Sequence, residues 1–210
     1  IVCLQEVVGH HTTKSKEIKN WPKTSQLEFL ADQVWEHQAY GKNAIHPKGD
    51  HGNAILSQFP IINWDNYDIS TRFEKRGILH AELKFPSESQ RLHLFCIHFG
   101  LFRKDRIMQT NLLINKIIKL VPEDSPMLIA GDFNDWQEDI SKLLYKKLNL
   151  EEAFLHLSGR HTLTFPSHFP LLPLDRIYYK NLNLDSAKTF DSKFWKKLSD
   201  HLPILAEFST

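Results

Sequence analysis

The feature of this sequence that most constrains its fold is a series of short apolar runs of the strand type, with only three or four helical stretches among them. So many strands with so few helices argue against a regular parallel βαβ array. We expect an α/β (α+β) fold in which two mainly antiparallel sheets pack face to face and helices cover the outside. The expected strands are 1–5, 54–57, 61–69, 77–85, 91–98, 127–130, 161–165, 174–179 and 202–208, and the expected helices are 26–37, 104–120 and 137–147.

The bulk properties of the chain are those of a soluble globular protein. A length of 210 residues is most simply one domain, 1–210. Lys plus Arg (26) nearly cancels Asp plus Glu (25), so any basic stripe for nucleic acid must be local. No apolar run approaches the ~20 residues that cross a bilayer. Cys3 and Cys96 lie in apolar runs, which favours buried thiols and a reducing, cytoplasmic location.

The most informative residues are polar side chains at the ends of the apolar runs. Strand ends open onto a common edge of a sheet, where side chains from distant parts of the chain converge. In chain order these residues are Gln5, Glu6, His98, Asp132, Asn134, Asp175, Asp200 and His201.

This set of carboxylates, amide and imidazoles suits phosphoryl transfer to water. Such a reaction places a water in line with the phosphate and neutralises charge on the phosphate oxygens. Mg²⁺ does this while held by one or two carboxylates, and Glu6 suits that role. Asp132 fits a base or orienter of the water, and Asn134 an amide donor to phosphate. A carboxylate such as Asp175 would keep a neighbouring histidine protonated.

The order of these motifs resembles the endonuclease/exonuclease/phosphatase superfamily, in particular its small bacterial members of unassigned substrate. The matching motifs are Gln5-Glu6, His-Gly-Asn-Ala-Ile-Leu-Ser at 51–57, a strand ending in His98, Gly131-Asp132-Phe133-Asn134, Leu174-Asp175-Arg176-Ile177 and Ser199-Asp200-His201-Leu202-Pro203. The resemblance implies a four-layer sandwich and a metal-dependent hydrolase of phosphate esters.

The resemblance also implies a role for each matching residue. Glu6 corresponds to the metal-binding glutamate, and Asp200 to a residue that contacts metal directly or through water; the metal would be Mg²⁺, with Mn²⁺ as a substitute. His98 corresponds to a second phosphate ligand or acid, although a strand-end histidine often only satisfies backbone groups.

The remaining correspondences concern the reacting phosphate itself. Asp132 corresponds to the aspartate that activates or orients water, and Asn134 to the asparagine that contacts phosphate. His201 corresponds to the histidine at the scissile phosphate, and Asp175 to the aspartate that pairs with it.

Several basic residues are secondary candidates for substrate binding. Arg76 and Arg103 could meet substrate phosphates through forked hydrogen bonds. The alternative is that they are solvated or paired with Glu74 and Asp105. The lysine-rich stretch 14–23 is typical of a solvated loop, although its mixture of lysines and a tryptophan would also suit a nucleic-acid contact.

One departure from the family pattern concerns the first strand. Family members begin with a strand that ends in an asparagine, and nothing precedes Ile1 here, so this strand is expected to be missing. Two functions follow. The first is a monomeric Mg²⁺-dependent phosphodiesterase acting on DNA, RNA or a phospholipid. The alternative is a non-catalytic binding or scaffold protein that retains the fold.

Overall fold

The computed structural model describes residues 1–11, 24–32, 34–47, 49–85 and 91–209. The lysine-rich stretch 14–23 lies outside them. The chain forms two compact units, Ile1–His98 and Phe99–Thr210. Whether they make up one domain, as the length suggests, stays a prediction. Within the described ranges, no helix has the length and apolar composition needed to span a membrane.

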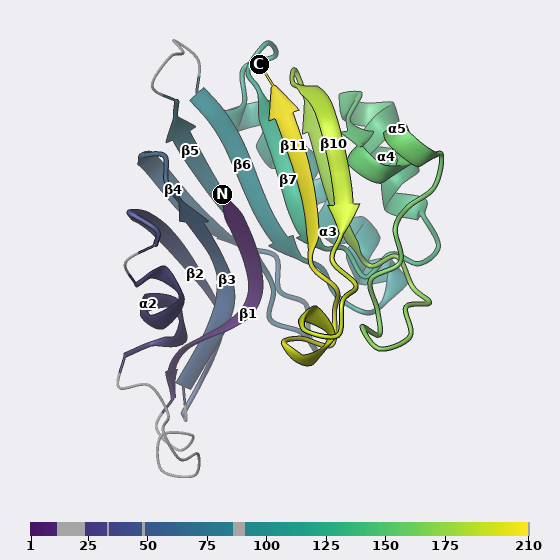
Figure 1. Ribbon diagram of the computed structural model, residues 1–210. Coiled ribbons are helices and arrows are strands. Elements are labelled where there is room, and N and C mark those ends of the chain that lie inside the picture. Colours follow the sequence, from purple (N-terminus) through teal and green to yellow (C-terminus); the bar gives the residue numbers. More distant parts are fainter. Residues whose placement is uncertain (12–23, 33, 48, 86–90, 210) are drawn as a thin grey trace. The chain divides into compact units, whose positions relative to one another are not determined.

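The first unit is built from two antiparallel strand systems (Figure 1). One is a three-stranded sheet with the order β1-β3-β2, and the other has the order β4-β5-β6. The strands β5 and β6 are buried along nearly their whole length, as expected for strands covered on both faces. The bounds are β1 Val2–His11, β2 His37–His46, β3 Gly49–Ser57, β4 Ile61–Asp68, β5 Gly77–Lys84 and β6 Arg91–His98.

A short helix, α2 (Gln26–Ala31), covers the three-stranded sheet. The Ser25 hydroxyl accepts a hydrogen bond from the Glu28 N–H, and the Glu28 carboxylate accepts one from the Ser25 N–H, which is the capping box that the sequence predicts. Leu27 and Ala31 then pack with Val7 and neighbouring apolar side chains of β3. The cap therefore fixes where the helix begins, and the apolar face fixes where it docks.

Two buried histidines lie side by side in the second strand system of the first unit. His80 on β5 and His93 on β6 are 3% and 5% exposed, and their Nε2 and Nδ1 atoms are 3.0 Å apart. Burial, and then the neighbouring His93, lowers the pKa of His80 to about 4. Burial also lowers the pKa of His93. The pair is therefore uncharged at neutral pH.

The histidine pair predicts a loss of stability in mild acid. Between pH 6.5 and about 4 the unfolded chain binds a proton at His80 that the folded chain does not bind. The free energy of unfolding should fall across this window by up to about 3 kcal/mol. Urea unfolding at pH 7.5 and pH 5 measures the change. The His80→Gln/His93→Gln variant should lose much of this pH dependence, and an unchanged dependence would contradict the assignment.

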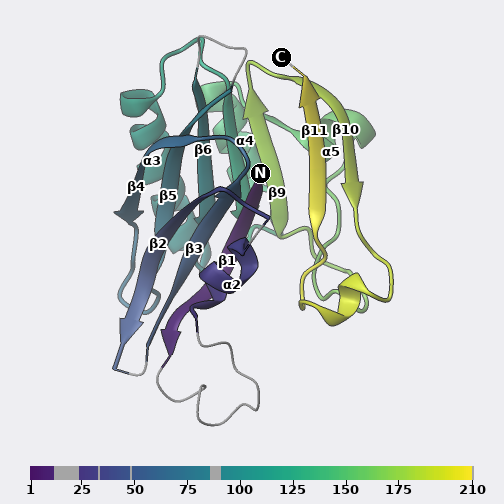
Figure 2. The ribbon, with the colours of Figure 1, turned by 60° about the vertical axis from the view of Figure 1, so that its left-hand side comes forward.

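The second unit has β7 (Met127–Asp132) paired with β9 (Asp175–Lys180), which in turn pairs with the short β8 (Glu151–Glu152). A separate hairpin joins β10 (Asn183–Thr189) and β11 (Ile204–Ser209). Figure 2 shows the two strands of this hairpin side by side. The helices are α3 Arg103–Leu120, α4 Asp139–Leu148 and α5 Ala153–Ser158, followed by the single turn η1 Trp195–Lys197.

The predicted fold class is confirmed, with two main sheets and flanking helices, but several elements differ from the predictions. The helix expected at 26–37 ends at Ala31, because residues 37–46 form strand β2. The strand expected at 161–165 is a turn-rich segment with one isolated bridge, Phe165 to Leu172. Helix α5 and strand β10 were not predicted, since α5 is only six residues long and β10 has few apolar residues.

Candidate active site

The end of β7 places Asp132 and Asn134 in a tight turn. Gly131 has φ 145° and Asn134 has φ 49°, which lets the chain reverse within a few residues. Asp132 Oδ1 accepts a hydrogen bond from the Asn134 backbone N–H at 2.8 Å, and Oδ2 accepts from Asn134 Nδ2 at 3.3 Å. Nδ2 also donates to the Phe99 carbonyl at 3.0 Å. Both amide hydrogens thus have protein acceptors, and Asn134 orients Asp132.

Asp175 lies directly across the β7–β9 ladder from Asp132. Its Oδ2 atom is 2.7 Å from Nδ1 of His201, so the predicted pairing of Asp175 with His201 is present as a hydrogen bond. His201 lies in the connection that leads into β11, far from β9 in sequence. The second unit therefore brings together Asp132, Asn134, Asp175 and His201.

The carboxylates around His201 make its imidazole a cation at neutral pH. Burial alone would lower the pKa of His201, but the hydrogen bond that its Nδ1–H donates to Asp175 and the negative charges of Asp175, Asp132 and Asp200 together raise it to about 9. Because Nδ1 faces Asp175, Nε2 is the nitrogen left to donate to a substrate. This arrangement suits a negatively charged group such as a phosphate.

The segment 161–174 holds the His201 segment in place. The Leu202 N–H donates to the Thr164 carbonyl at 2.9 Å, and the Ser167 N–H donates to the Asp200 carbonyl at 2.6 Å. The Thr164 hydroxyl accepts from the Asp175 N–H at 3.3 Å, which ties the same segment to β9. The Phe165 ring packs against the His201 ring with centroids 4.9 Å apart. Sequence reasoning missed these residues, since small hydroxyl side chains carry no chemical signal of their own.

A buried ion pair connects the turn after β7 to β9. Arg176 Nη1 lies 3.2 Å from Asp135 Oδ2, and the two side chains are 0% and 1% exposed. Asp135 also accepts from the Ile140 N–H at 2.9 Å, which fixes the start of α4. Since Asp135 follows Asn134 and Arg176 follows Asp175, the pair holds the two segments that carry the candidate residues.

The ion pair continues into a chain of buried hydrogen bonds. Arg176 Nη1 donates to the Ser141 hydroxyl, which also contacts the Tyr178 hydroxyl and His161 Nε2. His161 Nδ1 then pairs with Glu152 Oε2 at 2.8 Å. All these groups are at least nine-tenths buried. A signal available in the sequence was the Arg176 that follows the predicted Asp175, because a charged residue inside an apolar strand needs a partner.

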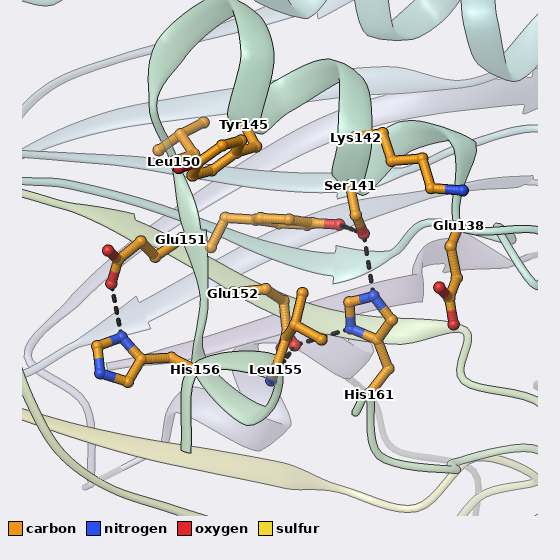
Figure 3. A pocket seen from close by; sticks show the side chains of 11 residues that line it. Glu138, Ser141, Lys142, Tyr145, Leu150, Glu151, Glu152, Leu155, His156 and His161 are labelled. Carbon is orange, nitrogen blue, oxygen red and sulfur yellow. Dashed lines mark hydrogen bonds and ion pairs between the residues drawn. The ribbon is translucent and has the colours of Figure 1, made fainter. Parts of the chain in front are cut away.

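Four residues of this hydrogen-bonded chain line a cavity of about 360 Å³ in the second unit (Figure 3): Ser141, Glu152, His161 and Tyr178. Figure 3 shows His161 between Ser141 and Glu152, with Tyr145 and Leu150 on one wall and His156 beside Glu151. None of the predicted site residues lines it. The cavity is therefore not the site that the sequence predicts.

The first unit places Glu6 beside His98. Glu6 has φ 55° and sits where the β1–β3 register shifts between Leu4 and Val7, which is a bulge. Its carboxylate is 65% exposed, and Oε1 lies 4.0 Å from His98 Nδ1. His98 itself is 7% exposed at the end of β6. The bulge turns Glu6 outward, so its carboxylate oxygens remain open to a ligand.

The other predicted residues are engaged in local contacts. Arg76 pairs with Glu74 at 3.1 Å, which is one of the two alternatives that the sequence allows. Arg103 pairs with Asp139 at 2.7 Å instead of the expected Asp105. Asp200 is exposed, and its Oδ1 atom accepts from the Ser199 hydroxyl at 3.4 Å. Among the described residues, no group of three or more His, Cys, Asp or Glu side chains is arranged to hold a metal ion.

The sequence motifs point to one family, and the comparison with known families decides the assignment. The model of the endonuclease/exonuclease/phosphatase family matches residues 1–201. The chain belongs to this family. Members of this family are hydrolases of phosphodiesters or other phosphate esters. The predicted resemblance is thereby confirmed.

Individual relatives agree with this assignment. The chain is 44% identical over 208 residues to the uncharacterized protein YbhP of Escherichia coli K12, covering 99% of this chain and 82% of YbhP. It has the fold of D. rerio TDP2 in complex with a single-strand DNA product, with a TM-score of 0.74, 19% identity, and coverage of 100% and 85%. The fold is also that of an endonuclease/exonuclease/phosphatase from Beutenbergia cavernae, with a TM-score of 0.72 and 15% identity. The alignment covers 99% of this chain and 61% of that protein.

Proposed function

We propose that this family member is a Mg²⁺-dependent phosphodiesterase in which water attacks a phosphodiester. The observation that carries the proposal is the Asp175–His201 hydrogen bond at 2.7 Å with Asp132 close enough to raise the pKa of His201. The cationic imidazole of His201 supplies a donor for a phosphate oxygen. The carboxylate of Asp132 supplies an acceptor for a proton from water.

Each residue of the second unit then has a distinct task. Asp132 accepts the proton of the attacking water, and Asn134 holds both carboxylate oxygens of Asp132 in one orientation. His201 Nε2–H donates to a phosphate oxygen as negative charge develops there. Asp175 keeps His201 protonated and fixes the direction of its ring. These side chains are set before substrate arrives, so little reorganisation is needed during the reaction.

The carboxylate of Glu6 fits a hard divalent cation. Within the described residues its only ion-pair partner is His98 at 4.0 Å, and the side chain is 65% exposed, so its oxygens are available. Glu6 would therefore bind Mg²⁺ or Mn²⁺ through its carboxylate. When bound, the metal supplies positive charge against the phosphate oxygens.

The first test is hydrolysis of bis-p-nitrophenyl phosphate with and without Mg²⁺ or Mn²⁺. We expect metal-dependent release of p-nitrophenol. If neither activity nor calorimetric binding of Mg²⁺ is found, the protein is a scaffold that retains the fold. DNA, supported by the product bound to the related TDP2 structure, and phospholipids are the two substrate classes to compare. Nuclease binding would weaken steeply as salt rises.

The His201–Asp175 pair predicts an alkaline limit to activity. Protonated His201 is present below a pH of about 9, so kcat should fall as pH rises through this value. The Asp175→Asn variant removes the charge that supports the imidazolium, so the alkaline limb of the pH–rate profile should move to lower pH. A pH–rate profile of both proteins measures the shift, and an unmoved limb would exclude His201 as the titrating group.

Glu6 predicts a change in metal requirement. In the Glu6→Gln variant the Mg²⁺ concentration for half-maximal activity should rise about tenfold or more, because a neutral amide replaces the anionic ligand. Glu36→Gln is a matched control, since Glu36 is another exposed glutamate of the first unit. Mg²⁺ titrations of the three proteins measure the effect. Equal Mg²⁺ dependence in all three would remove Glu6 from the metal site.

A further inference from the structure

Exposed apolar side chains gather on the two connections that flank His201. These connections are 163–173, before β9, and 190–198, between β10 and β11. We call their exposed residues the His201 rim. Its apolar members are Leu163 (44% exposed), Phe169 (70%), Leu171 (57%), Phe194 (63%) and Leu198 (61%). Scattered exposed apolar residues are normal, but a contiguous group marks an interaction site.

The two connections are joined to one another and to the His201 segment. The Ser167 hydroxyl donates to the Ser199 carbonyl at 2.8 Å and to the Lys196 carbonyl at 3.4 Å. The Ser167 N–H donates to the Asp200 carbonyl at 2.6 Å. Figures 1 and 2 both show the two connections at the same end of the second unit. The rim is therefore one surface next to His201.

The 190–198 connection is braced from within. The ring of Trp195 is half-buried and packs between Phe190 and Phe194, with centroid separations of 5.2 and 5.3 Å. The Phe190 N–H donates to the Pro203 carbonyl at 2.9 Å. Trp195 thus contacts both rings and links the two ends of this segment, while Phe194 stays 63% exposed.

Positive charge surrounds the exposed apolar residues of this connection. Lys193, Lys196 and Lys197 lie within five residues around Phe194, and the acidic residues nearest to them in sequence are Asp191 and Asp200. Lysines beside exposed Phe and Leu side chains are the composition of segments that lie in the interface of an anionic bilayer. Each lysine adds attraction to the lipid headgroups, while the apolar side chains enter the acyl boundary.

We propose that the His201 rim docks the protein on an anionic lipid surface and that the substrate is a phosphodiester in a lipid headgroup. The second part rests on the proposed function, since it assigns a substrate class to the same site. The rim adjoins His201, so a headgroup phosphate at the docked surface is next to the imidazolium that would receive it. The chain need not extract the lipid fully from the bilayer.

The composition of the rim favours lipid over nucleic acid. Leu171 and Leu198 offer no ring on which a base could stack. The formal net charge of +1 provides no extended basic track for a phosphate backbone. Single-stranded DNA is nevertheless the competing ligand to include, because aromatic and basic residues do occur together here.

The test is sedimentation with vesicles of phosphatidylcholine alone or mixed in equal parts with phosphatidylglycerol. We expect the full chain to bind only the anionic vesicles. Phe194→Ser/Leu198→Ser and Lys193→Gln/Lys197→Gln should each weaken binding about tenfold or more. Matched controls are Ile118→Ser on α3 and Leu157→Ser on α5, which remove side chains of similar exposure (66% and 49%) and should bind like the unaltered protein.

Other outcomes overturn the proposal in defined ways. Absence of binding to anionic vesicles, or equal binding by the rim variants, removes the docking surface. Loss of vesicle binding in the presence of single-stranded DNA, with DNA binding lost in the rim variants, makes the rim a nucleic-acid surface instead. Hydrolysis of bis-p-nitrophenyl phosphate should be unchanged in the rim variants. If that hydrolysis is absent in every protein while vesicle binding persists, the proposed function and the lipid substrate that rests on it fail, and the docking surface stands.

Discussion

Replacing Asp132 with alanine is expected to lower kcat for bis-p-nitrophenyl phosphate by about 10²–10⁴-fold, which is the usual contribution of a positioned general base. Both carboxylate oxygens of Asp132 accept hydrogen bonds from Asn134, and the negative charge of Asp132 helps to raise the pKa of His201. The alanine variant removes both the base and the charge that helps to keep His201 protonated. KM should change less than kcat, because the lost interaction belongs to the reacting water.

The matched control is Asp139→Asn. Asp139 is also an aspartate of the second unit, but it pairs with Arg103 at the surface. Its replacement should leave kcat within a small factor of the original value. Circular dichroism and the melting temperature of both variants establish whether each is folded. If Asp132→Ala were folded and retained its full kcat, Asp132 would not be the base.

Replacing Arg176 with methionine is expected to destabilise the protein by about 3–5 kcal/mol, because it leaves the Asp135 carboxylate buried without its partner. The pair is 0% and 1% exposed, and Asp135 cannot reach solvent without moving the start of α4. Urea unfolding at neutral pH measures the change. The double variant Asp135→Asn/Arg176→Met should be more stable than Arg176→Met alone, since it removes the uncompensated charge.

An exposed pair in the same unit provides the control. Arg103 and Asp139 have a shorter separation, 2.7 Å, but they lie in solvent, so Arg103→Met should change stability little. Arg176→Lys should recover only part of the loss, because an ammonium cannot reproduce the contacts of both guanidinium nitrogens, Nη1 to Asp135 Oδ2 and the Ser141 and Tyr178 hydroxyls and Nη2 to the Asp135 carbonyl. If Arg176→Met were as stable as Arg103→Met, the buried pair would not hold the site together.

The strand-end residues could be predicted from the sequence because each is a polar side chain next to an apolar run. Asp132 and Asp175 each adjoin an apolar run, and the register of β7 with β9 places them opposite one another. The pairing of Asp175 with His201 followed from the family resemblance and is present in the structure. The helix expected at 26–37 was too long, the strand at 37–46 was not predicted, and the strand expected at 161–165 is wrong, since a local pattern does not show which segment a strand will pair with.

The supporting residues could not be predicted in the same way. Thr164, Ser167 and Asp135 act through backbone geometry and through a partner distant in sequence, and no local pattern distinguishes them from ordinary turn residues. Cys3 and Cys96, in contrast, were predicted as buried thiols from the apolar runs around them; both are free thiols, Cys96 is buried and Cys3 is partly buried. Apolar context is a local property, whereas the identity of a hydrogen-bond partner is not.

In the proposed function, the β7–β9 ladder carries the residues that perform the reaction, and connections outside the ladder meet the substrate. Asp132 and Asp175 are fixed by backbone hydrogen bonds between two strands. The connection 163–173 leads into β9, the connection 190–198 joins β10 to β11, and both carry exposed side chains. A designer could therefore graft new loops at these two places and redirect the enzyme to another ester, while the spacing of the carboxylates stays set by the sheet.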